Sequence, residues 1–152
     1  MFGELIPSTW PTRRNHENER NEKHVLVTGA GGFIGHHLVS RLKAEGCWVH
    51  DADLKYPEFE PTRADEFELL DLRQWESCLR AGRNVNEVYN LAADMGGIGY
   101  ITAHLAEVAR NNILINAHML EASRTSSVNR FLFSSSACVY PQSSSQQLRS
   151  CL

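Results

Sequence analysis

Apolar residues follow two different periodicities along the middle of this chain. The run 25–28 (VLVT) is short and rich in β-branched residues, and Ile34, Leu38 and Leu42 then recur every fourth residue. A spacing of four is typical of one face of a helix. Gly46 stands where a glycine commonly ends such a helix. This region is therefore predicted to form a strand, a glycine-rich loop and a helix.

The same alternation continues for most of the chain. Further strands are predicted at 47–53, 66–70, 85–91 and 130–134, and further helices at 73–80 and 104–123. A glycine-rich loop is expected before the long helix. Strands that alternate with helices pair in parallel through right-handed crossovers. The pattern thus predicts an α/β fold built on a Rossmann-type, doubly wound parallel sheet.

The two ends of the chain lack this periodicity. Residues 1–23 contain two prolines, a pair of adjacent arginines and four glutamates, and we expect a flexible arm there. A transit peptide is a weaker alternative because such segments avoid acidic residues. Residues 142–152 are rich in Ser and Gln and are expected to form a disordered tail. A single domain at 24–141 is left between them.

Composition narrows the range of partners. Eighteen acidic against fifteen basic residues give a formal charge of -3, so no basic field is available for nucleic acid. No stretch approaches the roughly 18 apolar residues of a membrane span, and the start lacks the apolar core of a secretory signal. The four cysteines form no C-x-x-C pair and the histidines show no ligand spacing. We expect a cytoplasmic protein without metal, membrane or nucleic-acid partners.

One glycine-rich string lies between the first predicted strand and helix, GAGGFIG at 29–35. Its first glycine permits a tight turn, its fourth residue lets the backbone approach a pyrophosphate, and its last lets helix and strand pack closely. Backbone N–H groups and the helix dipole would face the anionic oxygens. The alternative is a glycine turn without a ligand. The residues expected to bind the cofactor here are Gly29, Gly32, Phe33, Ile34 and Gly35.

An acidic residue at the end of the second predicted strand is a candidate for the adenosine half of a dinucleotide. Asp53 follows Gly29 by 24 positions, about where a carboxylate meets the ribose hydroxyls. A carboxylate there would repel a 2′-phosphate, which favours NAD over NADP, although Lys55 weakens that preference. Asp51 is the competing acid, and strand register favours Asp53.

A second acidic residue follows the third predicted strand. Asp71 and the adjoining Leu72 could lie against the adenine of the cofactor. Asp71 could equally cap the helix that begins near Arg73. Both interpretations stay open on the sequence.

Two later strings complete a resemblance. The strings are NLAADMGGIGY at 90–100 and SSSACVYP at 134–141. They resemble the NAD-dependent nucleotide-sugar epimerase/dehydratase family, which is part of the extended short-chain dehydrogenases/reductases. The whole range 24–141 resembles the same family. Cys138 points to a subgroup that acts on GDP-mannose-like nucleotide sugars. The resemblance implies a cycle in which NAD takes a hydride from C4 of the sugar, C3 and C5 are inverted beside the ketone, and the hydride returns. It also implies that full-length relatives are homodimers.

The resemblance implies roles for individual residues. Ser136 would hydrogen-bond the sugar hydroxyl, and Cys138 would move a proton beside the ketone, which requires a thiolate. A small buried apolar residue is the alternative for Cys138. Asn111 and Asn112 would hold active-site backbone and water, or else lie on a solvated helix surface. The remaining implied residues are Leu91, Ala92 and Ala93 for the cofactor, and Met95, Gly96 and Gly97 for the substrate.

The chain departs from that family in its acid–base residues. Hydride transfer there needs a tyrosine acidified by a lysine four residues later, and none of the four tyrosines has one. We therefore expect a truncated N-terminal part without the C-terminal substrate lobe, inactive alone. The alternatives are a fragment that only binds NAD or docks onto a partner, and a different nucleotide-sugar 4-epimerase or 4,6-dehydratase. An apolar edge at 130–134 would favour self-association.

Overall fold

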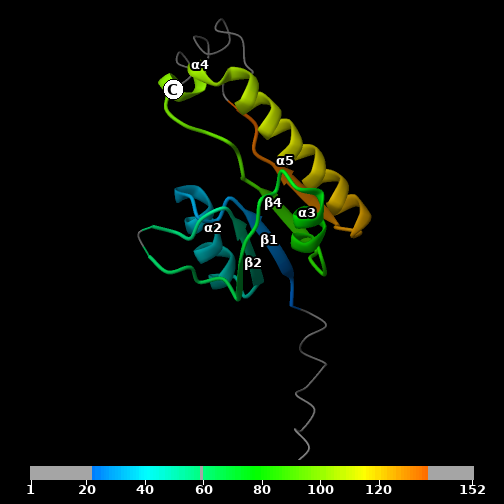
Figure 1. Cartoon of the computed structure of the whole chain (residues 1–152). Helices are drawn as coiled ribbons and strands as arrows, with labels where there is room; N and C mark the ends of the chain where they lie inside the picture. Colours follow the sequence, from blue (N-terminus) through cyan, green and yellow to red (C-terminus); the bar gives the residue numbers. More distant parts are fainter. Residues whose placement is uncertain (1–21, 59, 137–152) are drawn as a thin grey trace, which may run out of the picture.

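The computed structural model describes residues 22–58 and 60–136, which form one sheet flanked by helices (Figure 1). Its strands are β1 (His24–Thr28), β2 (Trp48–Asp53), β3 (Glu66–Leu69), β4 (Glu87–Asn90) and β5 (Arg130–Phe133). Its helices are α2 (Phe33–Ala44), α3 (Trp75–Ala81), α4 (Ile98–Ala103) and α5 (Leu105–Thr125). Among the helices of the described part, none combines the length and apolarity that crossing a bilayer requires.

All four strand pairs are parallel, and the strand order is β3-β2-β1-β4-β5. The chain builds outward from β1 to β3, then crosses back to place β4 on the other side of β1. The order therefore reverses between β1 and β4, which is where sheets of this kind bind ligands, beyond the carboxyl ends of the strands. The predicted α/β class with a Rossmann-type doubly wound sheet is confirmed.

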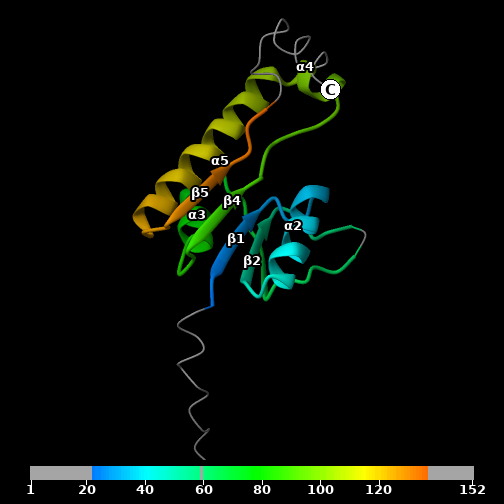
Figure 2. The ribbon, with the colours of Figure 1, turned by 180° about the vertical axis from the view of Figure 1, so that it is seen from behind.

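Helices cover both faces of the sheet, so its central strand is buried on both sides. Figures 1 and 2 show α2 on one face and α3 with α5 on the other. Side chains alternate along β1: Leu26 packs in the core with α3 and α5, whereas Val25 and Val27 pack in the core with α2. All three are fully buried, which explains why this strand is a continuous apolar run rather than an alternating one.

The long helix α5 buries one stripe against the sheet. Val108, Ile115, Met119 and Ala122 are buried, as expected from their spacing. Leu105 is 64% exposed, so its expected place in the stripe was wrong. It is the first residue of α5, where the helix runs past the carboxyl end of the sheet and has no strand beneath it (Figure 1).

One helix was not expected from the sequence. α4 occupies part of the segment expected to be a glycine-rich loop, and it contains Gly99. Glycine lowers helix propensity by about 1 kcal/mol, which disfavours a helix here, and α4 buries none of its residues. The Tyr100 hydroxyl lies 3.3 Å from the Asp94 carboxylate, so α4 contacts the loop that precedes it.

Candidate functional site

The turn between β1 and α2 can be built only with glycine. Gly29 has a φ of 71°, a left-handed conformation that favours glycine, and a Cβ on it would lie 2.8 Å from the backbone nitrogen of Ala92. A Cβ on Gly35 would lie 2.4 Å from the carbonyl oxygen of Gly29. Gly29 therefore lies between the loop that follows β4 and the first turn of α2.

The carboxylate of Asp53 is tied to this turn. Its Oδ2 accepts a hydrogen bond from the Gly31 N–H at 2.8 Å, and its Oδ1 accepts one from the Lys55 N–H at 3.2 Å. A Cβ on Gly31 would lie 2.3 Å from the carbonyl oxygen of Lys55. The ammonium of Lys55 pairs with the Glu58 carboxylate, and this hydrogen bond raises the pKa of Lys55. The positive charge beside Asp53 is thus already partnered.

Helix α2 begins without a side-chain cap. Its N-cap residue is Gly32, no side chain accepts from its first N–H groups, and its first turn contains no acidic residue. Unpaired N–H groups and the positive end of the helix dipole are favourable for an anion. The twelve residues of α2 therefore direct their positive end toward the same space as Gly29.

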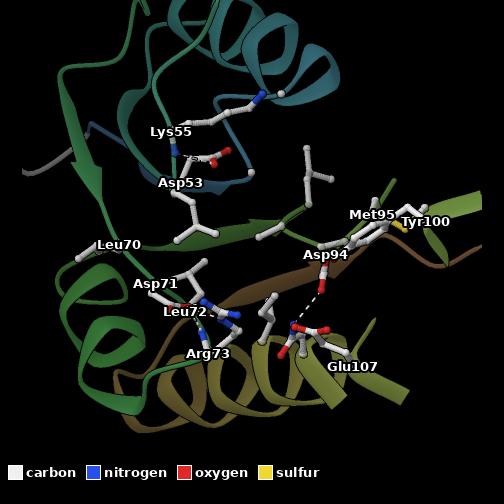
Figure 3. Close-up of a pocket in the computed structure, with 18 residues that line it drawn as sticks. Asp53, Lys55, Leu70, Asp71, Leu72, Arg73, Asp94, Met95, Tyr100 and Glu107 are labelled. Carbon is white, nitrogen blue, oxygen red and sulfur yellow. Dashed lines mark hydrogen bonds and ion pairs between the residues drawn. The ribbon is translucent and has the colours of Figure 1, made fainter. Parts of the chain in front are cut away.

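A pocket of about 510 Å³ lies at the carboxyl ends of the strands (Figure 3). The segment after β1 contributes Gly29 and Gly32, the end of β2 contributes Asp53, and the segment after β3 contributes Asp71 and Leu72. The loop after β4 contributes Leu91, Ala92, Ala93 and Met95. The structure thus brings together eight of the eleven residues expected at a cofactor and one of the three expected at a substrate.

The hydroxyl of Thr28 fixes the loop after β4. Oγ1 accepts hydrogen bonds from the N–H groups of Leu91 and Ala92, both at 3.1 Å, and donates to Oδ1 of Asn90 at 2.8 Å. Asn90 in turn donates to Asn116 of α5 at 2.8 Å. Thr28 is fully buried, so these bonds form away from water. Sequence reasoning missed this residue, whose only signal is a hydroxyl directly before Gly29.

Two asparagines of α5 clamp the next residue of the loop. The side-chain oxygen of Asn112 accepts from the Asp94 N–H at 2.8 Å, and its amide donates to the Asp94 carbonyl at 3.0 Å. Asn111 is buried and donates to the Asp94 carboxylate at 2.8 Å. Of the two interpretations left open for this pair, the geometry of Asn112 agrees with the one in which it holds backbone, whereas Asn111 holds the Asp94 side chain at the rim of the pocket.

The carboxylate of Asp71 is engaged with its neighbour Arg73. It accepts from the backbone N–H of Arg73 at 3.0 Å, from Nε at 2.9 Å and from Nη2 at 2.8 Å. The Arg73 side chain lowers the pKa of Asp71, although burial opposes the shift. Since α3 begins at Trp75 with Gln74 as its N-cap, Asp71 holds the turn before the helix rather than capping it, and it also borders the pocket.

The arrangement now described, a glycine turn leading into an uncapped helix where the strand order reverses, is that of a dinucleotide site. The sequence profile of the NAD dependent epimerase/dehydratase family matches residues 25–151. The chain belongs to this family. The resemblance found in the sequence is therefore confirmed.

Several members of the family are similar to this chain. GDP-mannose 3,5-epimerase 1 of Oryza sativa subsp. indica and GDP-mannose 3,5-epimerase of Arabidopsis thaliana are each 46% identical over 120 residues, or 78% of this chain and 32% of theirs. The solved UDP-glucose 4-epimerase of Thermus thermophilus, in complex with NAD, is 32% identical with a TM-score of 0.66, over 74% of this chain and 37% of that one. The chain spans about one third of the length of these relatives.

Three residues expected at the cofactor lie apart from the pocket. Phe33 and Ile34 are 75% and 70% exposed, and Phe33 packs edge-on against His37 with ring centroids 4.6 Å apart. Ile34 was expected to begin the apolar face of this helix, but the buried face of α2 consists of Gly35, Val39 and Leu42, so that expectation was wrong for Ile34. Gly35 itself lies beneath the turn, against Gly29. Only their backbone N–H groups, at the start of α2, could serve the site.

The remaining expected residues lie on the β4–β5 side. Gly96 packs beneath Tyr100, where a Cβ would lie 2.6 Å from the ring, and Gly97 has no atom within 4 Å of a Cβ. Ser136 lies three residues beyond β5, and the residues that line the pocket do not include it. Cys138 lies outside the described residues.

The lower side of the pocket in Figure 3 is lined by charged residues to which the sequence analysis gave no role in the site. Arg73 and Glu107 project from the segments at α3 and α5, and Asp94 faces them from the loop after β4. Tyr100 closes the same end of the pocket. Arg73 and Glu107 lie in no local motif, whereas Asp94 and Tyr100 belong to the string 90–100, which did not reveal that they face the pocket.

Proposed function

We propose that this chain forms the NAD-binding part of a nucleotide-sugar epimerase whose substrate is GDP-mannose or a close analogue. The observation that carries the proposal is the glycine turn. Gly29, Gly31 and Gly35 leave no room for a Cβ against backbone atoms, so only glycine lets the turn bring the uncapped start of α2 to the pocket. The likeness to GDP-mannose 3,5-epimerases over 120 residues supports the choice of substrate class.

The residues present fit the dinucleotide in charge as well as in shape. The start of α2 would take the pyrophosphate, and Asp53, whose carboxylate is bonded to Gly31 of the adjoining turn, would accept the ribose hydroxyls. Leu72 and the turn held by Asp71 would lie beside the adenine. Leu91, Ala92 and Ala93 would follow the nicotinamide half. Because Lys55 is paired with Glu58, the carboxylate of Asp53 remains the dominant charge near the ribose, which favours NAD over NADP.

The chemistry proposed for the assembled site is a transient oxidation of the sugar. Bound NAD supplies the hydride acceptor for C4. Ser136 would hydrogen-bond the C4 hydroxyl, and Cys138 would exchange a proton at the carbons beside the ketone. Backbone groups at Met95, Gly96 and Gly97 would contact the sugar. These roles rest on the resemblance of the strings 90–100 and 134–141 to the family.

We further propose that the 152 residues bind NAD without turning over a sugar by themselves. The sequence holds three lysines, Lys23, Lys43 and Lys55, and all precede β4. No tyrosine therefore has the lysine that would acidify its phenol. Loss of acid–base assistance costs about 10²–10⁴ in rate. A module that binds NAD without chemistry is thus the second candidate, and the missing Tyr-x-x-x-Lys favours it for this chain alone.

Calorimetric titration with NAD and NADP, beside a turnover assay with GDP-mannose, tests both candidates. We expect NAD to bind at least about ten-fold more tightly than NADP, a difference of about 1.4 kcal/mol, with no detectable epimer. Asp53→Asn should reduce the ratio of the NADP dissociation constant to the NAD dissociation constant. Glu76 is exposed on α3, so Glu76→Gln should leave that ratio unchanged. A folded sample that binds neither nucleotide contradicts the proposal, and epimer formation contradicts the claim of inactivity.

A further inference from the structure

A second cluster of ionisable side chains lies on β2 and β3, apart from the pocket. His50 pairs in register with Glu66, the first residue of β3, whereas Asp53 at the pocket pairs with Leu69, the last. Each strand residue advances the chain by about 3.3 Å, so the cluster lies about 10 Å from Asp53 toward the amino ends of the strands. It shares no residue with the nucleotide pocket.

The cluster faces α3. His50 precedes Ala52 by two positions, and Ala52 packs in the core beneath α3 and α5, so His50 lies on that face of the sheet. Glu66 and Glu68 are likewise two positions apart and share a face of β3. One oxygen of Glu66, one of Glu68 and a ring nitrogen of His50 all lie within 4.8 Å of one another.

His50 carries the observation that points to a ligand. Its side chain is 5% exposed, and its Nε2 is buried without a hydrogen-bond partner. That nitrogen faces Oε1 of Glu68 at 3.4 Å. A buried ring nitrogen without a hydrogen-bond partner is costly, and a cation between it and the facing carboxylate would satisfy both groups.

The spacing and the charges suit a metal ion. Two ligands of a tetrahedral Zn²⁺ with bonds of about 2.0–2.1 Å lie about 3.4 Å apart, and this is the separation of His50 Nε2 and Glu68 Oε1. Arg80 pairs with the other oxygen of Glu68, which leaves Oε1 directed at His50. Two carboxylates and one guanidinium leave a net charge of about -1 for a divalent cation to neutralise.

We propose that His50, Glu66 and Glu68 form a binding site for a divalent transition-metal ion of the Zn²⁺ type, with water completing the coordination. Imidazole nitrogen and carboxylate oxygen are ligands that Zn²⁺ accepts together. Burial lowers the pKa of His50, whereas Glu66, Glu68 and a bond to the Ala81 backbone raise it. The sequence contains no metal motif here because the ligands stand 16 and 18 positions apart.

Titration of the full chain with ZnCl₂ at pH 7, followed by calorimetry and by the ring ¹⁵N signals of the histidines, tests the proposal. We expect Zn²⁺ to shift the His50 signal, and Glu66→Gln to weaken that binding about ten-fold or more. Glu66 is exposed, so its replacement leaves the fold intact. Glu76→Gln is the matched control and should bind as the wild type does.

Several results would contradict the proposed metal site. If Zn²⁺ leaves the His50 signal unmoved, or if Glu66→Gln and Glu76→Gln bind alike, the cluster is a salt-bridge network with Arg80 and not a metal site. Zn²⁺ bound at cysteines would shift no His50 signal and would also contradict the proposal. Because the readout is metal binding, it is independent of whether the pocket takes NAD.

Discussion

The two halves of the sheet's carboxyl edge differ in how closely they are packed. On the β1–β2 half, Gly29 and Gly35 approach backbone so closely that neither accepts a Cβ, and Asp53 is bonded to the turn. On the β4–β5 half, Met95 is 68% exposed and Phe133 is 53% exposed. Both halves border the strand-order reversal, and the loop after β4 is held by Thr28 and Asn112, but these two apolar side chains of the second half stay exposed.

This difference separates two tasks of the site. A surface that receives an anionic dinucleotide needs fixed backbone N–H groups, and these come from a turn whose geometry is set locally. A surface that receives a sugar needs enclosure by side chains from several elements. The exposed apolar residues after β4 and in β5 are not enclosed by the described part of the chain.

We call the β1–β2 half the tight half and the β4–β5 half the open half. The largest expected effect on stability is in the tight half. Gly35→Ala would place a Cβ 2.4 Å from the Gly29 carbonyl oxygen and 2.7 Å from the Ala30 Cα. Since backbone must move to admit it, we expect a loss of about 3 kcal/mol in the free energy of unfolding, measured by urea denaturation, together with loss of NAD binding. Gly99→Ala on the open half meets nothing within 4 Å and should be neutral or slightly stabilising. Equal losses in the two variants would remove the distinction between the halves.

The next effect concerns a buried acid beneath the tight half. Asp51 is fully buried, and burial raises its pKa to about 7, although the Thr62 hydroxyl that donates to it at 2.6 Å opposes the shift. Because the folded pKa exceeds the usual value of 3.8, the stability contributed by the protonated acid is present below pH 4 and is lost as the pH rises to 7. Asp51→Asn should therefore raise the free energy of unfolding at pH 8 by about 2 kcal/mol and change it little at pH 4.

Asp65 is a control because its pKa is shifted in the opposite direction to that of Asp51. Burial would raise its pKa, but the Lys43 ammonium and the Val49 N–H outweigh burial and lower it. Its stabilising contribution is present above the unfolded pKa and is lost as the pH falls through the folded one. Asp65→Asn should destabilise the chain at pH 8 and much less in acid. Parallel pH profiles for the Asp51 and Asp65 variants would contradict the assignment of a protonated Asp51.

The smallest expected effect concerns Thr28, whose hydroxyl connects β1 to the loop after β4. Thr28→Val keeps the shape of the side chain but leaves the N–H groups of Leu91 and Ala92 without their hydroxyl acceptor. Leu91 retains a bond to the Thr28 carbonyl at 3.3 Å, so we expect a loss of about 1.5 kcal/mol and weaker NAD binding. Thr102→Val, on the exposed α4, should change stability by less than about 0.5 kcal/mol. An unchanged melting curve for Thr28→Val would show that the loop after β4 is held by other contacts.

The sequence by itself determined the elements whose signals are local. The apolar run of β1, the glycines of the turn and the fourfold spacing of α2 follow one another within about twenty residues, and each depends on neighbouring positions alone. The resemblance of 90–100 and 134–141 added the family. Periodicity and glycine geometry are properties of short segments, so they can be read without knowing the fold.

Only the tertiary structure decided which side chains meet. Thr28 and Asn90 are 62 positions apart, and Asp94 and Asn112 are 18 apart, so neither bond has a local pattern. The cluster at His50 depends in the same way on the pairing of separate strands. The physical reason is that parallel strands align residues by register across the sheet, and register is a property of the assembled sheet rather than of any one segment.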